Sequence, residues 1–252
     1  MIRRLLILLV ILMSSASSAW ARDKIYKFAV DTYYPPFSFT DEKTGELSGF
    51  DVDIAKAVCQ KMNVACEVVA VPFDEIIPQV ESGRLDVGCA GFAYIEERAR
   101  RLLYTDKYFR SSSLFLELPG TFEDVRPETI RGKKVAVQAG TNQERYLRHD
   151  YGQVIEIVPV KGFEEIIDGI NDQTFDLGFI DGLAGYHYLK SDAGLGVDII
   201  GDPYHISPGG NGMVLRKDQE AFRDRINQAI EDLRLSGEYD AINIKYFEFN
   251  VY

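Results

Sequence analysis

Histidine, cysteine and basic residues are scarce in this sequence of 252 residues. The three histidines, His149, His187 and His205, lie far apart and lack the spacing of metal ligands, so we predict neither a metal site nor a cofactor. Lysine and arginine number 28 against 39 aspartate and glutamate residues, which gives a formal net charge of −11. Because such a surface repels polyanions, nucleic acid is not an expected partner.

Long apolar runs are also rare, and the longest lies at the N-terminus. Arg3 and Arg4 precede the run Leu5–Met13, and the segment ends in Ala19-Trp20-Ala21. A basic start, an apolar middle and an A-x-A site are typical of a signal peptide. The run is too short to span a bilayer comfortably, and no later run is long and apolar enough. We predict a signal peptide over residues 1–21, cleaved after Ala21; an uncleaved membrane anchor is the alternative.

Three cysteines permit at most one disulfide within the chain. Cys59 and Cys66 are close in sequence, and Asn63 between them is of a type that often ends a helix. A bond between the two cysteines would tie a helix end to the following strand. Cys89 lies in an apolar run and is expected to be a buried thiol. The alternative, three free thiols, is uncommon in exported proteins.

The stretch from Leu85 to Arg98 has the pattern of an anion site. An apolar run with strand character passes through Gly91, and the charged segment Glu96–Arg101 has the composition of a helix start. Free N–H groups at a helix start attract anions, and small residues let a ligand approach the backbone. Arg98 is suited to bind a carboxylate through two hydrogen bonds. We predict a site for the carboxylate of a small molecule; the alternative is an ordinary junction with a solvated arginine.

Strands and helices alternate along most of the chain, which predicts an α/β fold with mostly parallel strands. The order strand, helix, strand, helix, strand occurs twice, and each series ends in a turn that suits a ligand. The first series is expected at Lys24–Asp31, Gly49–Met62, Glu67–Val71, Phe73–Ser82 and Leu85–Gly91. The second is expected at Lys134–Gln138, a helix opening at 139–143, Val154–Val160, Phe163–Ile170 and Phe175–Ile180. A strand at Met213–Arg216 and a long helix at Gln219–Leu235 follow.

Motifs of catalysis and of nucleotide binding do not stand out. The segment Gly209-Gly210-Asn211-Gly212 does not match a dinucleotide fingerprint and is predicted to be a turn. No Ser/His/Asp order, metal cluster or phosphate loop is evident, so the residues do not indicate an enzyme.

Several segments resemble, in order, the periplasmic amino-acid-binding proteins of ABC importers, extracellular solute-binding family 3. Residues 49–55 resemble the family's helix motif G-F-D-[LIV]-D-[LIV]-A. Further matches are Asp31-x-x-Tyr34-x-Pro36-Phe37, Ala90-Gly91, Glu97-Arg98, Tyr104-Thr105-Asp106, Gly140-Thr141, Phe175-Asp176 with Asp181, and Lys245–Phe249. The spacing of Cys59 and Cys66 and the ending Phe249–Tyr252 are similar to those of the histidine-binding and lysine/arginine/ornithine-binding members. The likeness covers essentially the whole mature chain.

The resemblance implies the two-lobed periplasmic binding protein fold (type II), in which two crossing strands join the lobes. Each lobe would be a mostly parallel sheet flanked by helices, with residues 22–109 and 206–252 in lobe 1 and residues 110–205 in lobe 2. The protein would be a periplasmic monomer, not an enzyme, that closes on a free amino acid. It would deliver this ligand to the membrane permease of an ABC importer.

The same resemblance implies roles for individual residues. Arg98 and the N–H groups around Gly91 and Ala93 would bind the α-carboxylate, and Asp181 the α-ammonium group. The other implied ligand-binding residues are Asp31 at the distal group, Tyr34 and Phe73 on either side of the side chain, and Ala90, Phe92, Gln138, Thr141, Asn142 and Gln143. Alternatively, Asp181 is a helix cap, and Tyr34 and Phe73 are core aromatics.

The implied ligand is a basic amino acid: arginine, lysine, ornithine or histidine. A neutral polar amino acid such as glutamine is the alternative, because Asp31 also occurs in glutamine-binding relatives. Ala93 stands where the family usually has a serine or threonine whose hydroxyl meets the α-carboxylate. The missing hydrogen bond would weaken binding by up to about tenfold.

A similar scaffold carries cyclohexadienyl dehydratase activity, with a catalytic glutamate just after the aspartate of the second lobe. Ala184 occupies that position here and cannot act as a general acid, so dehydration is not expected. The ligand-sensing half of a receptor is a further alternative, which would need a transmembrane or signalling segment after Tyr252.

Overall fold

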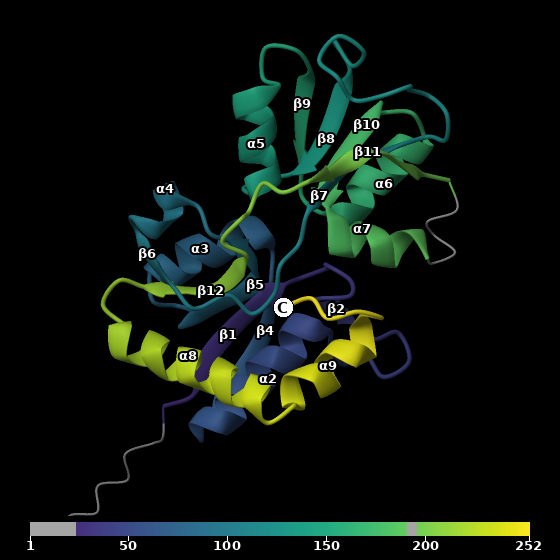
Figure 1. Cartoon of the computed structure of the whole chain (residues 1–252). Helices are drawn as coiled ribbons and strands as arrows, with labels where there is room; N and C mark the ends of the chain where they lie inside the picture. Colours follow the sequence, from purple (N-terminus) through teal and green to yellow (C-terminus); the bar gives the residue numbers. More distant parts are fainter. Residues whose placement is uncertain (1–23, 191–195) are drawn as a thin grey trace, which may run out of the picture.

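The chain forms two lobes, each with its own sheet, in the computed structural model, which describes residues 24–190 and 196–252 (Figure 1). Both ends of the described chain lie in the lower lobe, and the middle of the chain forms the upper one (Figure 1). The predicted signal peptide and its cleavage site lie outside the described residues. Within the described ranges, no helix has the length and apolar character needed to cross a membrane.

Lobe 1, the lower lobe, is built on a five-stranded sheet. Its strands are β1 (Tyr26–Asp31), β4 (Cys66–Val71), β5 (Val87–Ala93), β6 (Leu102–Tyr104) and β12 (Asn211–Arg216), in the spatial order β4-β1-β5-β12-β6. Its helices are α2 (Phe50–Met62), α3 (Phe73–Glu81), α4 (Glu96–Ala99), α8 (Glu220–Leu235) and α9 (Glu238–Tyr246). A small hairpin pairs β2 (Phe39–Thr40) with β3 (Leu47–Ser48).

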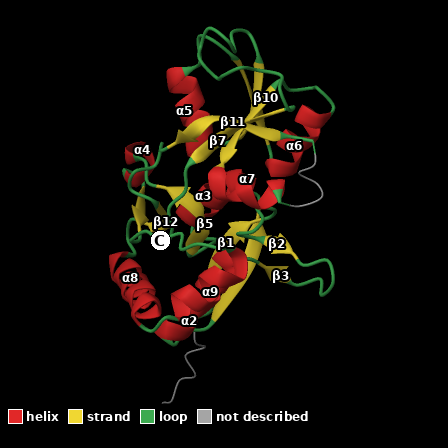
Figure 2. Ribbon diagram, turned by 45° about the vertical axis from the view of Figure 1, so that its right-hand side comes forward, coloured by secondary structure: helices red, strands yellow, loops and turns green. Residues whose placement is uncertain are grey.

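Side chains that alternate along the strands bury both faces of this sheet. Phe28 and Val30 pack in one core cluster with α2, α8 and α9, which lie together on one side of the lobe (Figure 2). Ala29, between them in β1, packs in a second cluster with Ile76 and Val80 of α3. Successive residues of a strand point to opposite faces, so an almost continuous apolar strand can serve two helical layers.

Lobe 2 repeats this plan with another five-stranded sheet. Its strands are β7 (Ser113–Glu117), β8 (Lys134–Gln138), β9 (Glu156–Val160), β10 (Leu177–Asp181) and β11 (Asp198–Tyr204), in the spatial order β11-β7-β10-β8-β9. Its helices are α5 (Asn142–Asp150), α6 (Phe163–Asn171) and α7 (Gly182–Leu189). Leu114 and Leu116 pack with α6, while Phe115 faces the cluster that includes Leu147 of α5.

The expectation of mostly parallel sheets is confirmed, because four of the five strands in each sheet run in one direction and a single strand runs against them. In lobe 1, β1 pairs in parallel with β4 and β5, but β12 is antiparallel to β5 and β6. In lobe 2, β8 pairs in parallel with β9 and β10, but β7 is antiparallel to β10 and β11. β7 and β12 are the strands that enter from the other lobe rather than after a helical crossover, so nothing requires them to run parallel to their neighbours.

Two extended segments connect the lobes. Phe109 pairs with Asn211 on the lobe 1 side, and Ser113 pairs with Tyr204 on the lobe 2 side. The crossings therefore occupy residues 109–113 and 204–211. The turn predicted for residues 209–212 is only partly correct, because Asn211 and Gly212 already belong to β12. Their pairing with β5 places the start of this strand inside the sheet.

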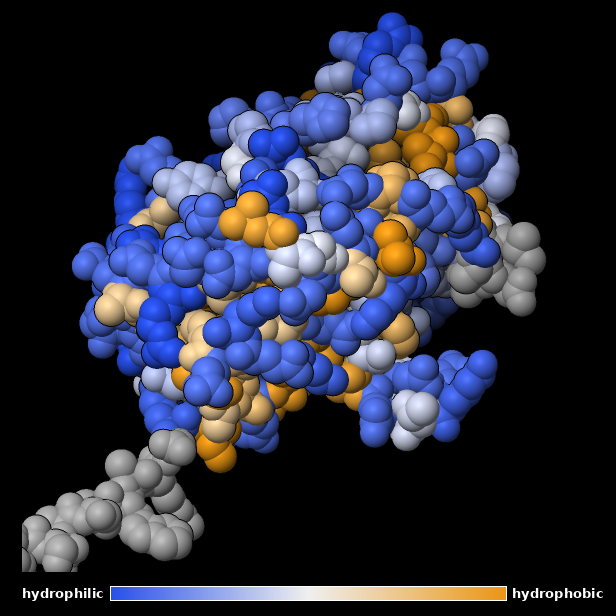
Figure 3. Space-filling model, turned by 60° about the horizontal axis from the view of Figure 1, so that its bottom comes forward, coloured by the Kyte–Doolittle hydropathy of each residue, from blue (hydrophilic) through white to orange (hydrophobic). Residues whose placement is uncertain are grey.

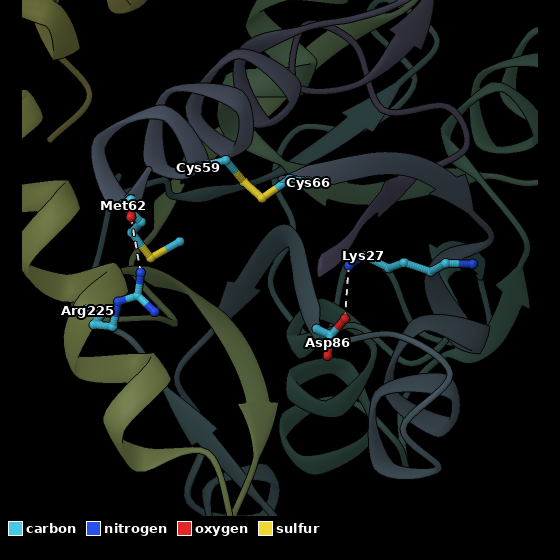
Figure 4. Close-up of a disulfide and its surroundings, with 6 residues drawn as sticks. All are labelled: Lys27, Cys59, Met62, Cys66, Asp86 and Arg225. Atoms are coloured by element: carbon cyan, nitrogen blue, oxygen red, sulfur yellow. Dashed lines mark hydrogen bonds between the residues drawn. A yellow bond between two sulfur atoms is a disulfide. The ribbon is translucent and has the colours of Figure 1, made fainter. Parts of the chain in front are cut away.

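The predicted disulfide is present and joins the end of α2 to the start of β4 (Figure 4). Asn63, which ends α2, adopts a left-handed conformation with φ of 52°. This turn brings Cys66 back beside Cys59 within a sequence separation of 7 residues. Cys89 is unpaired and fully buried, as predicted.

The lower face of lobe 1 is mainly hydrophilic, with apolar residues in scattered patches (Figure 3). The most exposed large apolar side chains of the described residues are Leu235 and Ile244, at 79% and 75% exposure. Single exposed apolar residues are ordinary on a folded protein and indicate no particular partner.

Candidate functional site

A cavity lies between the two lobes, where strands of both sheets end. Lobe 1 contributes Asp31 from the end of β1, and lobe 2 contributes Gln138 from the end of β8 and Asp181 from the end of β10. Ligands of open α/β sheets bind at the carboxyl ends of strands, so this cavity is the candidate site. The remaining lining residues are Tyr34, Phe73, Ala90, Gly91, Ala93, Arg98, Ser111, Ser112, Ser113, Thr141, Asn142, Gln143, Phe163, Ile166, Phe179, Ile180, Ser207 and Asn211.

All the residues predicted for the site line this cavity except Phe92. The ring of Phe92 is fully buried and stacks on that of Phe73, with 5.0 Å between the centroids. The Arg98 guanidinium also lies over the Phe92 ring, with its Cζ atom 5.3 Å from the ring centroid. Phe92 therefore contacts two lining residues, Phe73 and Arg98, but does not line the cavity itself. Whether the lining residues contact a ligand stays a prediction.

Arg98 is buried, so the alternative of a solvated arginine is wrong. The helix α4 that carries it is a single turn, shorter than predicted, because β6 already begins at Leu102. One guanidinium nitrogen, Nη1, donates to the carbonyl of Ala93 at 3.4 Å and to the hydroxyl of Tyr104 at 3.3 Å. The other, Nη2, donates across the cavity to the carbonyl of Gly140 in lobe 2, at 3.1 Å.

The N–H of Gly91 points away from the predicted anion site. It donates to the hydroxyl of Tyr108 at 3.1 Å, and this hydroxyl in turn donates to the Asp51 carboxylate at 2.7 Å. The Gly91 carbonyl accepts from the side chain of Asn211 at 2.8 Å. Gly91 has φ of 59°, a left-handed conformation that favours glycine. Both the N–H and the carbonyl of Gly91 are thus hydrogen-bonded within lobe 1. Burial raises the pKa of Asp51, which accepts from the Tyr108 hydroxyl, well above its usual value.

Asp31 and Gln138 meet across the cavity. The Gln138 amide donates from Nε2 to Asp31 Oδ2 at 3.0 Å and to the carbonyl of Lys161 at 3.3 Å. Asp31 Oδ1 accepts from the N–H of Thr32 at 2.7 Å. Asp31 is only 4% exposed, and this burial raises its pKa to about 6. The hydrogen bonds from Gln138 and Thr32 favour the ionised carboxylate but do not cancel the effect of burial.

Asp181 is both a helix cap and a lining residue, so the two sequence interpretations are compatible. Its Oδ1 accepts from the N–H groups of Leu183 and Ala184, at 3.0 and 3.2 Å, at the start of α7. The hydroxyls of Ser111 and Tyr34 lie near the carboxylate and favour its ionised form. Protein atoms surround it except where it borders the cavity, and burial raises its pKa to about 6.

The start of α5 connects the cavity to both crossings. The Asn142 side chain donates to the carbonyl of Ile206 at 3.0 Å and to the hydroxyl of Ser207 at 2.8 Å. The Gln143 side chain donates to the hydroxyl of Ser113 at 3.1 Å. Thr141 caps the helix by accepting from the N–H of Glu144 at 3.1 Å. Asn142 and Gln143 therefore have protein partners that belong to the hinge between the lobes.

The sequence interpretation missed the polar residues of the crossings: Ser111, Ser112, Ser113, Ser207 and Asn211. The only sequence signal was a run of three serines inside an otherwise apolar extended segment. It also missed Phe163 and the apolar lining residues of β10, because periodicity assigns them to the core.

The charged side chains of the lining do not balance. Asp31 and Asp181 are carboxylates, and Arg98 is the one cation among the described lining residues. With all three ionised, the cavity carries one net negative charge. A buried charge is stable only when it is paired, so a ligand with one net positive charge complements this cavity. Among the described residues, no group of three or more His, Cys, Asp or Glu side chains is arranged to hold a metal ion.

Comparisons with known proteins agree with this geometry. A model of the bacterial extracellular solute-binding proteins, family 3, matches residues 26–249. The histidine-binding periplasmic protein of Escherichia coli strain K12 is 31% identical over 252 residues, covering 97% of this chain and 96% of that protein. The lysine/arginine/ornithine-binding periplasmic protein of the same strain is 30% identical over 251 residues, with the same coverage.

A solved structure shows the same architecture. An ancestral arginine-binding protein bound to arginine matches with a TM-score of 0.82 and 31% sequence identity. The match covers 88% of this chain and 98% of that protein.

Proposed function

The chain belongs to family 3 of the bacterial extracellular solute-binding proteins, and from this we propose that it binds a basic amino acid between its lobes for an ABC importer. The observation that carries the proposal is the charge of the cavity, where the buried Asp31 and the half-buried Asp181 stand against one guanidinium. Arginine, lysine and ornithine carry one carboxylate and two cationic groups, which neutralise this set. Protonated histidine does the same. The names of the relatives point to the same ligand class.

Each charged group of the ligand has a partner of opposite sign in the proposal. Arg98 binds the α-carboxylate, Asp181 the α-ammonium group, and Asp31 the distal cation. Gln138 supports this distal end, because its Nε2 is already committed to Asp31 and Lys161 and its oxygen remains an acceptor. Tyr34 and Phe73 border the cavity and supply aromatic faces that suit a cationic side chain.

The proposal includes the route of the protein and its working parts. Residues 1–21 direct export and are removed after Ala21, and the mature monomer acts in the periplasm. Lobe 1 comprises residues 22–109 and 206–252, and lobe 2 residues 110–205. Closure of the lobes presents the loaded protein to the membrane permease. The protein is not an enzyme in this proposal: Ala184 is fully buried in α7 and offers no general acid beside Asp181.

Isothermal titration calorimetry tests the ligand class. The mature protein is unfolded and refolded to remove carried-over ligand, then titrated with arginine, lysine, ornithine, histidine, glutamine and prephenate. We expect binding of at least one basic amino acid at micromolar concentration or below. The Asp31→Ala variant should bind that ligand much more weakly. Binding of glutamine alone would refute the basic class, and binding of prephenate alone would favour the dehydratase scaffold.

A further inference from the structure

Ser111 lies in the middle of the first crossing, between the last pairing of lobe 1 and the first of lobe 2. Phe109 is held by Asn211 on one side, and Ser113 pairs with Asp181 on the other. The side chain of Ser111 borders the cavity. It is therefore the point where the hinge touches the candidate ammonium site.

The crossing is pressed against the start of α7. The N–H of Gly182 donates to the carbonyl of Ser112 at 2.8 Å. A Cβ at Gly182 would lie 2.6 Å from Ser112 Oγ and 3.2 Å from the Ser112 carbonyl oxygen, so a larger residue would require the crossing to shift. The N–H of Leu183 is shared between Asp181 Oδ1 at 3.0 Å and Ser111 Oγ at 3.3 Å.

The Ser111 hydroxyl donates to the carbonyl of Ser112 at 3.1 Å. It also lies beside the Asp181 carboxylate, because both oxygens accept from the N–H of Leu183. An ionised acceptor makes the stronger hydrogen bond, so we expect the proton to turn from the Ser112 carbonyl to Asp181 when that carboxylate is charged. The bonds from Leu183 and Ala184 hold Oδ1 at the helix start, and a donor from the crossing restricts rotation of the carboxylate.

We infer that Ser111 is a positioning residue that orients the Asp181 carboxylate toward the α-ammonium group of the ligand and links its recognition to the crossing. The inference rests on the proposed function, in which Asp181 binds this group. Removal of the hydroxyl leaves the Leu183 N–H bonded to Asp181, so the start of α7 keeps its cap and the fold is retained. The effect then falls on the ammonium group alone.

The test compares each ligand with its analogue that lacks the α-amino group. The basic amino acid that wild type binds most tightly is titrated beside its deamino form (deamino-arginine, deamino-lysine, deamino-ornithine or deamino-histidine). The variants are Ser111→Ala, Ser111→Thr, which retains a hydroxyl, and Arg110→Ala. Arg110→Ala is the matched control, because Arg110 is the neighbouring residue of the same crossing, is exposed and does not line the cavity.

We expect Ser111→Ala to weaken binding of the amino acid about tenfold and binding of the deamino form less than about twofold. Ser111→Thr should recover most of the loss, and Arg110→Ala should change either affinity less than about twofold. Equal losses for both ligands, or equal effects of the two alanine variants, would overturn the inference and leave the proposed function intact. Wild type that binds no basic amino acid would overturn both.

Discussion

Ligand affinity should depend steeply on pH, because the two carboxylates of the cavity titrate near neutrality. Burial raises the pKa of Asp31 and of Asp181 to about 6 in the ligand-free protein. A bound cation requires both groups to be ionised. Below about pH 6 the ligand must therefore displace protons, and its affinity falls as the pH falls.

The size of the effect follows from these values. At about pH 5, a group with a pKa of about 6 is ionised in about one molecule in ten, which lowers affinity about tenfold. Two such groups lower it about 100-fold relative to about pH 7.5, where both are mostly ionised. The Asp31→Asn variant retains one of the two groups, so its affinity should change only about tenfold over the same range.

Calorimetry with arginine or lysine measures this dependence directly, because neither ligand titrates between these pH values. Titrations in buffers of different ionisation enthalpy count the protons released at about pH 5. Asp202→Asn is the matched control, since Asp202 is exposed and outside the cavity. An affinity that is flat across the range would refute the reasoning. So would an Asp31→Asn variant with the same pH dependence as wild type.

Three further predictions concern stability and the carboxylate site. Asp31→Asn should raise the melting temperature of the ligand-free protein at about pH 7.5, and raise it less at about pH 4.5. The reason is that the raised pKa of Asp31 makes its ionised form destabilising above about pH 6. A lower melting temperature of the variant at about pH 7.5 would contradict this. Replacing Cys59 and Cys66 by serine should lower the free energy of unfolding, measured in urea, by about 2–3 kcal/mol and leave the ligand affinity unchanged. The reason is that the disulfide closes a short loop outside the cavity. A changed affinity would show that the loop is coupled to the site. Ala93→Ser should strengthen amino-acid binding by up to about tenfold in calorimetry, because Ala93 borders the cavity beside Arg98 and lacks a hydroxyl; weaker binding would argue against a carboxylate at this position.

The elements of both lobes could be predicted from local patterns. The strand β8 has the predicted bounds, Lys134–Gln138, and α2 ends at Met62 before Asn63, as predicted. These signals come from neighbouring residues: apolar periodicity, turn residues and helix ends. The alternation of strands and helices also predicted that most strands run in one direction, but it could not identify β7 and β12 as the two that run the other way. Whether β7 and β12 run parallel or antiparallel depends on which strands they meet after crossing between the lobes.

The sequence by itself determined which side chains were available to the site, since Asp31, Arg98 and Asp181 stand in segments with recognisable patterns. Only the tertiary structure decided which of them meet. Asp31 and Gln138 are 107 residues apart in sequence. They come together because Asp31 ends β1 of lobe 1, Gln138 ends β8 of lobe 2, and these two strand ends face one another across the cavity. Ser111 acquires its place beside Asp181 in the same way, from the path of a crossing strand. Local patterns reflect contacts within a few residues, whereas a site between lobes depends on how whole sheets are arranged.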